Sequence, residues 1–208
     1  MKINRLALRL CMCALVLLRA LSLYADGKDS LSRKMIHMAG IDVKPAYVFP
    51  THEFFAGNNA TFSPIRKNLS VHLKYGFKFA PDTYFGRMYP HAVQGIGVGY
   101  NTFFHSSELG NPWSVYAFQT SRIASLTPRL SLDYEWNFGA SFGWKKYDAE
   151  SNPYNRVVGS KMNAYIHLSF LLNWQLDAQT NLRAGIGATH FSNGNTGYPN
   201  AGVNAFGA

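Results

Sequence analysis

Cysteine is nearly absent from this chain of 208 residues, since Cys11 and Cys13 are its only two. Both lie in the first 25 residues, which we interpret as a leader that is removed. The remaining chain then has no thiol, which excludes disulfides, thiolate metal sites and a cysteine nucleophile. Six of the seven histidines show neither an H-x-H nor an i,i+4 pairing; these are His37, His52, His72, His91, His105 and His167. We therefore expect no bound metal and no cofactor.

A long unbroken apolar run is also missing. Residues 1–25 carry basic residues and then the run LCMCALVLLRALSLYA, which Arg19 interrupts. This run falls short of the ~20 apolar residues that a spanning helix needs. The pattern predicts a secretory signal peptide that is cleaved after Ala25, with an uncleaved anchor as the alternative. A lipoprotein leader is excluded because neither Cys11 nor Cys13 follows a small residue.

The chain also lacks a large excess of charge. Removal of residues 1–25, which hold four basic residues and no acid, lowers the formal net charge from +9 to +5. A moderate positive surplus suits an anionic partner such as phosphate-bearing lipid. Nucleic acid is not expected, because the chain is exported and has no basic run interleaved with aromatic residues.

Alternation of apolar and polar residues is what the chain has in abundance. It extends over 68–80 (NLSVHLKYGFKFA), 130–145 (LSLDYEWNFGASFGWK) and 163–177. In the second stretch the apolar face holds Trp136 and Trp144, whereas Ser, Asp, Glu, Asn and Gly lie opposite. A period of two is the period of a β-strand, so these stretches predict strands.

The length and chemistry of these strands indicate the kind of β protein. The three stretches are 13, 16 and 15 residues long, whereas strands of soluble proteins mostly have about 5–6. One face is apolar and aromatic, and the other is small or polar, as in a barrel with lipid outside and a packed polar lumen. A soluble lipocalin-like barrel, with the pattern inverted, is the alternative. We predict an all-β fold, an eight-stranded antiparallel transmembrane β-barrel.

The predicted organisation is a signal peptide (1–25), an N-terminal periplasmic segment (26–42) and the barrel (43–208). The strands are expected near 43–56, 68–80, 92–104, 112–123, 129–145, 161–176 and 181–192, with a last one from about 201. With both termini periplasmic, the outer connections are 57–67, 105–111, 146–160 and 193–200. The inner connections are 81–91, 124–128 and 177–180. Only four residues follow Asn204, too few to complete a final strand, so we expect the natural chain to continue.

Candidate chemistry is concentrated in HFSNGNTGYPNAG, residues 190–202. His190 and Ser192 are two positions apart at a strand end, so they share one face and suit a general base and its nucleophile. They also share the even parity of Leu182 and Ile186, which predicts that both face lipid at the rim. The alternative is an ordinary Asn- and Gly-rich turn.

This segment resembles the outer-membrane lipid A 3-O-deacylases, the PagL family. Their motif is His-x-Ser-Asn, a Pro-Asn-x-Gly that begins nine residues after the His, and a Glu fourteen after it. The matching residues here are His190, Ser192, Asn193, Pro199, Asn200 and Gly202. The resemblance implies an ester hydrolase that acts on lipid A of lipopolysaccharide at the outer membrane of a Gram-negative bacterium. It implies Ser192 as nucleophile, His190 as base, and Asn200 with the region of Asn193 and Gly194 as oxyanion support.

The chain departs from the family at one position, since Asn204 stands where the family has glutamate. An asparagine can accept a hydrogen bond from the His Nδ1–H and orient the ring, but it cannot stabilise the imidazolium by charge. We expect Asn204 to serve as a weaker third member; the alternatives at this position are that another acid substitutes for it or that the protein is catalytically impaired. The alternatives to a deacylase are a non-enzymatic barrel with a structural or adhesive role and a lipid A acyltransferase. Either a monomer or a homodimer is compatible with the sequence.

Overall fold

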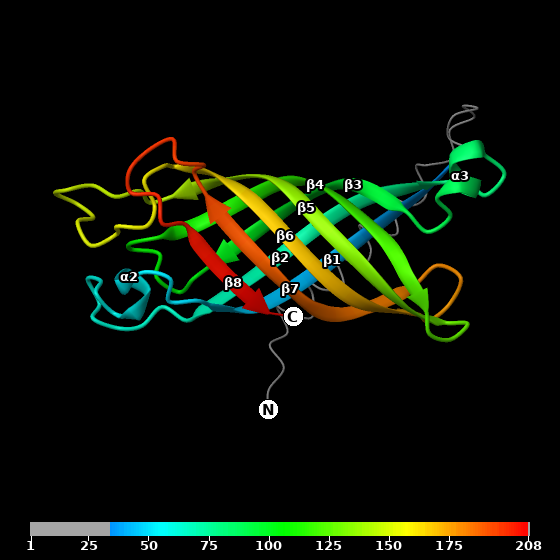
Figure 1. The fold of residues 1–208 in the computed structure, drawn as a ribbon, viewed down its shortest axis with the longest axis horizontal. Coiled ribbons are helices and arrows are strands. Elements are labelled where there is room, and N and C mark those ends of the chain that lie inside the picture. The colour runs from blue at the N-terminus through cyan, green and yellow to red at the C-terminus, as the bar shows by residue number, and fades with distance from the viewer. Residues whose placement is uncertain (1–33, 208) are drawn as a thin grey trace, which may run out of the picture.

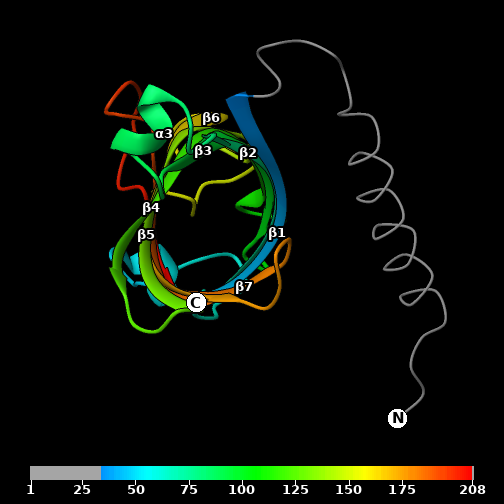
Figure 2. The same ribbon diagram turned by 90° about the vertical axis from the view of Figure 1, so that its right-hand side faces the viewer.

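Eight antiparallel strands close into one barrel in the computed structural model, which describes residues 34–207. Each strand pairs with its neighbours in chain order, and β8 pairs with β1 to close the ring (Figures 1 and 2). The strands are β1 (Met35–Val48), β2 (Lys67–Phe79), β3 (Val93–Thr102), β4 (Gly110–Ser125), β5 (Leu130–Trp144), β6 (Met162–Gln175), β7 (Asn181–Ser192) and β8 (Val203–Gly207). The predicted eight-stranded barrel is confirmed. The predicted signal peptide lies outside the described residues.

The connections gather at the two ends of the barrel as the sequence predicted (Figure 1). One end carries 49–66, 103–109, 145–161 and 193–202, and the first of these contains the short helix α2 (Glu53–Ala56). The other end carries 80–92, 126–129 and 176–180, and the first of these contains α3 (Tyr84–Met88). None of the helices among residues 34–207 is long and apolar enough to cross a membrane.

Apolar side chains of the strands point outwards and polar ones point into the lumen. Exposed outward side chains include Ile41, Val43, Val71, Leu73, Ile96, Val115, Phe138, Ile166, Leu168, Phe170, Leu172 and Ile186. Buried lumen side chains include Ser70, His72, Lys74, Asn101, Ser114, Thr120, Asp133, Glu135, Asn137, Ser141, His167 and Ser169. A soluble barrel has the opposite arrangement, so this distribution is that of a barrel surrounded by lipid.

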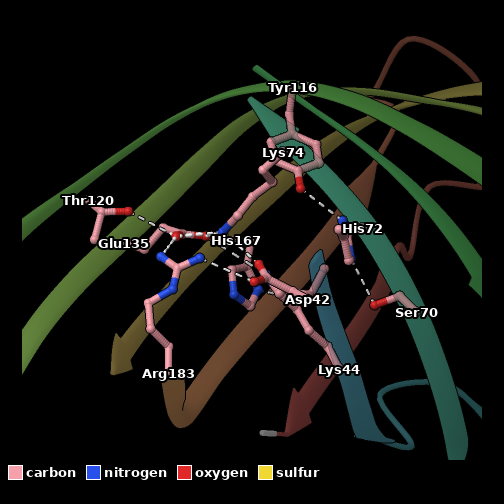
Figure 3. Close-up of polar contacts among 11 residues, drawn as sticks. Asp42, Lys44, Ser70, His72, Lys74, Tyr116, Thr120, Glu135, His167 and Arg183 are labelled. Carbon is pink, nitrogen blue, oxygen red and sulfur yellow. Dashed lines mark hydrogen bonds and ion pairs between the residues drawn. The ribbon is translucent and has the colours of Figure 1, made fainter. Parts of the chain in front are cut away.

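A network of charged side chains fills the middle of the lumen (Figure 3). Lys74 Nζ lies 2.6 Å from the Asp42 carboxylate and 2.7 Å from that of Glu135. Arg183 reaches both acids at 3.2 Å, and Lys44 lies within 4.0 Å of both. Buried charges are tolerated only when they are paired, so these contacts hold β1, β2, β5 and β7 around a common centre.

The start of the barrel differs from the prediction. β1 begins at Met35, so the expected boundary at residue 43 and the separate segment 26–42 are wrong for residues 35–42. The alternation of apolar and polar residues is weak in this part, because the outward Ala39 and the inward Gly40 are both small. It is nevertheless a strand, because β1 pairs with β2 from Met35 to Tyr47. The expected extension to residue 56 is also wrong. Pro50 cannot donate a ladder hydrogen bond. The helix α2 follows, and His52 caps its N-terminus, since His52 Nδ1 accepts from the backbone N–H of Phe54 at 3.1 Å.

One aromatic residue of the predicted outward face points inwards. Trp144 is only 3% exposed and donates its indole N–H to Ser141 Oγ at 2.8 Å. The preceding Gly143 has φ of 89°, and the pairing of β4 with β5 shifts register beside it. The irregularity ends the alternation after Phe142 and turns the indole into the lumen.

The network predicts that Glu135→Gln destabilises the barrel. The variant leaves Lys74, Lys44 and Arg183 with Asp42 as their one remaining acid in the network, and breaking a buried ion pair costs about 3–5 kcal/mol. The free energy of unfolding in urea, measured after refolding into lipid vesicles, is the readout. Glu150→Gln, the same change on an exposed loop residue, is the control. Equal stability of the two variants would contradict the assigned role.

Candidate active site at the end of strand β7

Phe191 fixes the direction of its two neighbours. Its side chain is 1% exposed and lies inside the barrel against the rings of Trp144, Tyr165 and Phe103, with ring centroids 5.1, 5.4 and 6.1 Å away. Successive residues of a strand point to opposite faces. His190 and Ser192 therefore project from the outer face, as the sequence predicted.

His190 is bonded to the residue that replaces the family glutamate. His190 of β7 and Asn204 of β8 are direct partners in the strand register, and His190 Nδ1 lies 2.7 Å from Asn204 Oδ1. A carbonyl oxygen can only accept, so the proton of the neutral imidazole lies on Nδ1. Nε2 is then left with its lone pair, which is the state that a general base requires.

Ser192 lies one step further along the same face, at the last residue of β7. Its register partner on β6 is Ala164, whereas that of His190 is Ile166, so the small side chain lies beside the serine. Among the described residues no hydrogen bond joins His190 to Ser192. Catalytic pairs often tighten only when substrate is bound, so the shared face is the relevant geometric feature.

Gly202 lies beside this pair, and the sequence predicted for it only a place in the motif. Its φ is 72°, which an L side chain rarely adopts. A Cβ built on it would lie 3.4 Å from His190 Cε1 and 3.5 Å from Ser192 Cβ, and only 2.8 Å from the Phe191 carbonyl oxygen. A side chain here would crowd both residues, so glycine keeps the space beside the histidine and serine open.

The Asn193 side chain is held within its own loop. It is buried, and its amide nitrogen donates to the carbonyls of Gly197 at 2.7 Å and Pro199 at 3.5 Å. Its amide oxygen accepts from the backbone N–H of Asn195 at 3.1 Å. These bonds shape the loop 193–202, so the side-chain amide is occupied and is not aimed at a substrate.

Two other predicted oxyanion donors lie in the same loop. Asn200 is exposed, and its amide nitrogen donates to the side-chain oxygen of Asn195. Gly194 has φ of 62°, and a Cβ built on it would meet nothing within 4 Å. Both positions are therefore open to a ligand at this end of the barrel. The Asn200 amide would first have to break its hydrogen bond to Asn195.

A neighbouring loop supports the site, and no feature of the sequence indicated it. The backbone N–H of Gly202 donates to the Val157 carbonyl at 3.2 Å. Gly159 packs so closely on Tyr198 and Pro199 that a Cβ there would collide with their backbone. The loop 145–161 is itself held because the Asn152 and Asn155 amides donate to the Glu108 carbonyl at 2.9 and 2.8 Å.

The surroundings of the pair change from apolar to polar along the strand. On the outer face below His190 lie Ala188 and Ile186, with Leu168 of β6 opposite Ala188. Above Ser192 begins the Asn- and Gly-rich loop. Within residues 34–207 no group of three or more His, Cys, Asp or Glu side chains is placed to hold a metal ion. The site can therefore offer a base and a hydroxyl to an ester at the boundary between an apolar and a polar phase.

The chain matches the model of a known protein family. The model described as lipid A 3-O-deacylase (PagL) matches residues 95–208, more than half of the chain. The matched region contains most of β3, all of β4 to β8, and the residues His190, Ser192 and Asn204. Comparisons with curated proteins and with solved structures gave no match.

The His190–Asn204 contact predicts how substitutions at position 204 act. Asn204→Ala removes the acceptor that orients the ring and should lower the hydrolysis rate roughly 10- to 100-fold, less than the ~10⁴-fold loss known for a charged third member. Asn204→Glu should preserve or raise the rate, because a carboxylate also stabilises the imidazolium. Rates are compared at equal folded amounts in detergent–lipid micelles.

Asn58→Ala is the matched control for Asn204→Ala, because Asn58 is an exposed asparagine on the loop 49–66. Equal rates for the wild type, Asn204→Ala and Asn204→Glu would show that Asn204 is not the third member.

Proposed function

Because the chain belongs to the PagL family of lipid A 3-O-deacylases, we propose that it hydrolyses the ester at the 3-position of lipid A. The products are the 3-hydroxy fatty acid and lipid A with one acyl chain fewer. The reaction takes place in the outer leaflet of the outer membrane of a Gram-negative bacterium, where lipopolysaccharide lies.

One observation carries the proposal, which is the hydrogen bond of 2.7 Å between His190 and Asn204 on the outward face that also holds Ser192. A structural histidine would need no oriented Nε2 on a lipid-facing surface, where polar groups are costly. A non-enzymatic barrel requires none of this arrangement. No feature of residues 34–207 favours an acyltransferase.

The reaction follows serine ester hydrolysis. His190 Nε2 takes the proton of the Ser192 hydroxyl as Oγ attacks the acyl carbonyl carbon. The tetrahedral intermediate collapses, the ester C–O bond breaks, and the sugar hydroxyl leaves with the proton from His190. Water then gives a proton to His190 and attacks the acyl-enzyme. As the fatty acid leaves, His190 returns that proton to Ser192 Oγ, which restores both residues. This chemistry needs no metal.

The oxyanion of each intermediate needs donors on the loop 193–202. We assign this role to the Asn200 amide and to backbone N–H groups at Asn193 and Gly194. Gly194 supports the assignment, because its φ is positive and its surroundings are open. A ligand can therefore approach its backbone closely, as an oxyanion donor requires. The Asn193 side chain contributes indirectly, because it holds the loop in shape.

The depth of the site fits an ester at the lipid boundary. Ile166 and Ile186 lie on the apolar outer face beside or below His190, and both are exposed. The acyl chain would lie along this face, and the sugar would lie level with the loop. The end that bears His190 therefore faces the cell exterior, and α3 lies at the periplasmic end.

Substitution of the nucleophile tests the proposal. Lipid A from cells that express Ser192→Ala or His190→Ala should keep all its acyl chains, whereas wild-type protein should yield lipid A lighter by one 3-hydroxyacyl group. Mass spectrometry of the extracted lipid A is the measurement. Heat-modifiable gel migration establishes that each variant folds.

Ser106→Ala removes an exposed hydroxyl from a loop at the same end and should leave deacylation unchanged. Deacylation by either site variant would overturn the catalytic assignment. A gain in lipid A mass with the wild type would indicate acyl transfer.

Orientation in the membrane gives a second prediction. A membrane-impermeant thiol reagent should label Glu150→Cys on intact cells, because 145–161 lies at the outer end. It should label Gln179→Cys, on the connection 176–180, only after the cells are broken. The reverse pattern would place His190 in the wrong leaflet for lipopolysaccharide.

A further inference from the structure

The connection 80–92, at the end opposite the catalytic site, is much longer than its neighbours 126–129 and 176–180. It contains α3 and carries four large side chains that remain exposed. Tyr84, Phe85, Met88 and Tyr89 are 64%, 52%, 55% and 58% exposed. Such a cluster at the surface requires an explanation, because water is a poor surrounding for it.

The segment is held in one conformation by its own polar groups. The Thr83 hydroxyl accepts from the Gly86 backbone N–H at 3.0 Å and donates to the Ala80 carbonyl at 2.7 Å. Arg87 donates to the Asp82 carbonyl at 2.7 Å. Gly86 packs on the same turn, where a Cβ would collide with the Ala80 carbonyl. These polar groups thus form their hydrogen bonds within the connection itself. The same bonds keep the aromatic side chains on its outer surface.

The spacing of the four residues places them together. Positions i, i+1 and i+4 lie on one face of a helical turn, which here are Tyr84, Phe85 and Met88. Tyr89 follows directly as the C-cap residue of α3. Gly86, on the opposite face, is buried against Ala80. The result is a short amphipathic element whose apolar side remains exposed at the surface.

This aromatic face is continuous with the outer surface of the barrel. The Phe85 ring lies 5.3 Å from that of Phe79, which lies 6.0 Å from that of Phe77, on β2. Phe77 shares its parity with the exposed Val71 and Leu73 of the apolar band. Viewed from this end, α3 lies at the rim of the ring and not across the lumen (Figure 2).

We propose that the aromatic face of Tyr84, Phe85, Met88 and Tyr89 inserts into the interfacial layer of the inner, phospholipid leaflet and anchors that end of the barrel. The continuity with the lipid-facing band supports a lipid partner, because a bilayer around the band reaches this rim. Tyrosine suits such a position, since its ring is apolar and its hydroxyl remains hydrated. Arg87, whose side chain is exposed on the same helix, can form ion pairs with lipid phosphates.

The proposal rests on the membrane placement given under the proposed function, so the experiment separates the two. The full chain, with Cys11 and Cys13 replaced by serine, carries one nitroxide label at Tyr84→Cys or Met88→Cys. It is refolded into vesicles of phosphatidylethanolamine and phosphatidylglycerol. Two control labels are Leu168→Cys in the outward band and Gln179→Cys on the short connection at the same end. Collisions with oxygen and with a water-soluble nickel chelate are measured by electron paramagnetic resonance.

The labels at 84 and 88 should show an oxygen-to-nickel accessibility ratio several-fold higher than the label at 179, and lower than that at 168. A ratio equal to that at 179, with 168 in lipid, would overturn the anchor alone. Protection from both reagents at 84 and 88 would also overturn it, because it would indicate a protein contact. A label at 168 that is accessible to nickel would instead refute the membrane placement itself.

Discussion

A side chain in a closed barrel has only two directions, and the burial of Phe191 decides which one its neighbours take. The Phe191 ring packs against Trp144 and Tyr165 inside the barrel. His190 and Ser192 must then face outwards, into the phase that surrounds the barrel. Under the proposed function, the substrate therefore meets the outer wall of the barrel and not its lumen. The aromatic cluster in the lumen would then serve the reaction only indirectly, because it sets the direction of His190 and Ser192.

The charged network has a comparable role at the centre of the barrel. Asp42 on β1 and Arg183 on β7 meet within the lumen at 3.2 Å, and Lys74 and Glu135 link them to β2 and β5. These contacts fix the position of β7, the strand that carries the histidine and serine. Compared with apolar packing, buried ion pairs add little net stability. They do constrain the relative positions of the groups that form them. In this barrel they link β1 and β7, the two strands that flank β8, and so help keep the end of β7 beside β8, where Asn204 can reach His190.

Much of the fold was predictable, because a period of two survives in most strands. The face of His190 and Ser192 followed from the parity of β7 alone. The prediction failed where backbone geometry interrupts the pattern. Gly143 turns Trp144 inwards, and the weakly alternating residues 35–42 form a strand because β2 pairs with them. The occupation of the Asn193 amide by loop carbonyls, and the packing of Gly159 on Pro199, depend on contacts between loops that sequence spacing does not contain.

The central claim is that Ser192 is a nucleophile activated by His190 on the outer wall of the barrel. A long-chain alkyl fluorophosphonate, which reacts only with an activated serine, tests this most directly in detergent–lipid micelles. Intact-mass and peptide mass spectrometry should show one adduct, on Ser192, with labelling abolished in His190→Ala and slowed in Asn204→Ala. An unlabelled Ser192 in the folded wild type, or labelling that does not depend on His190, would contradict the account.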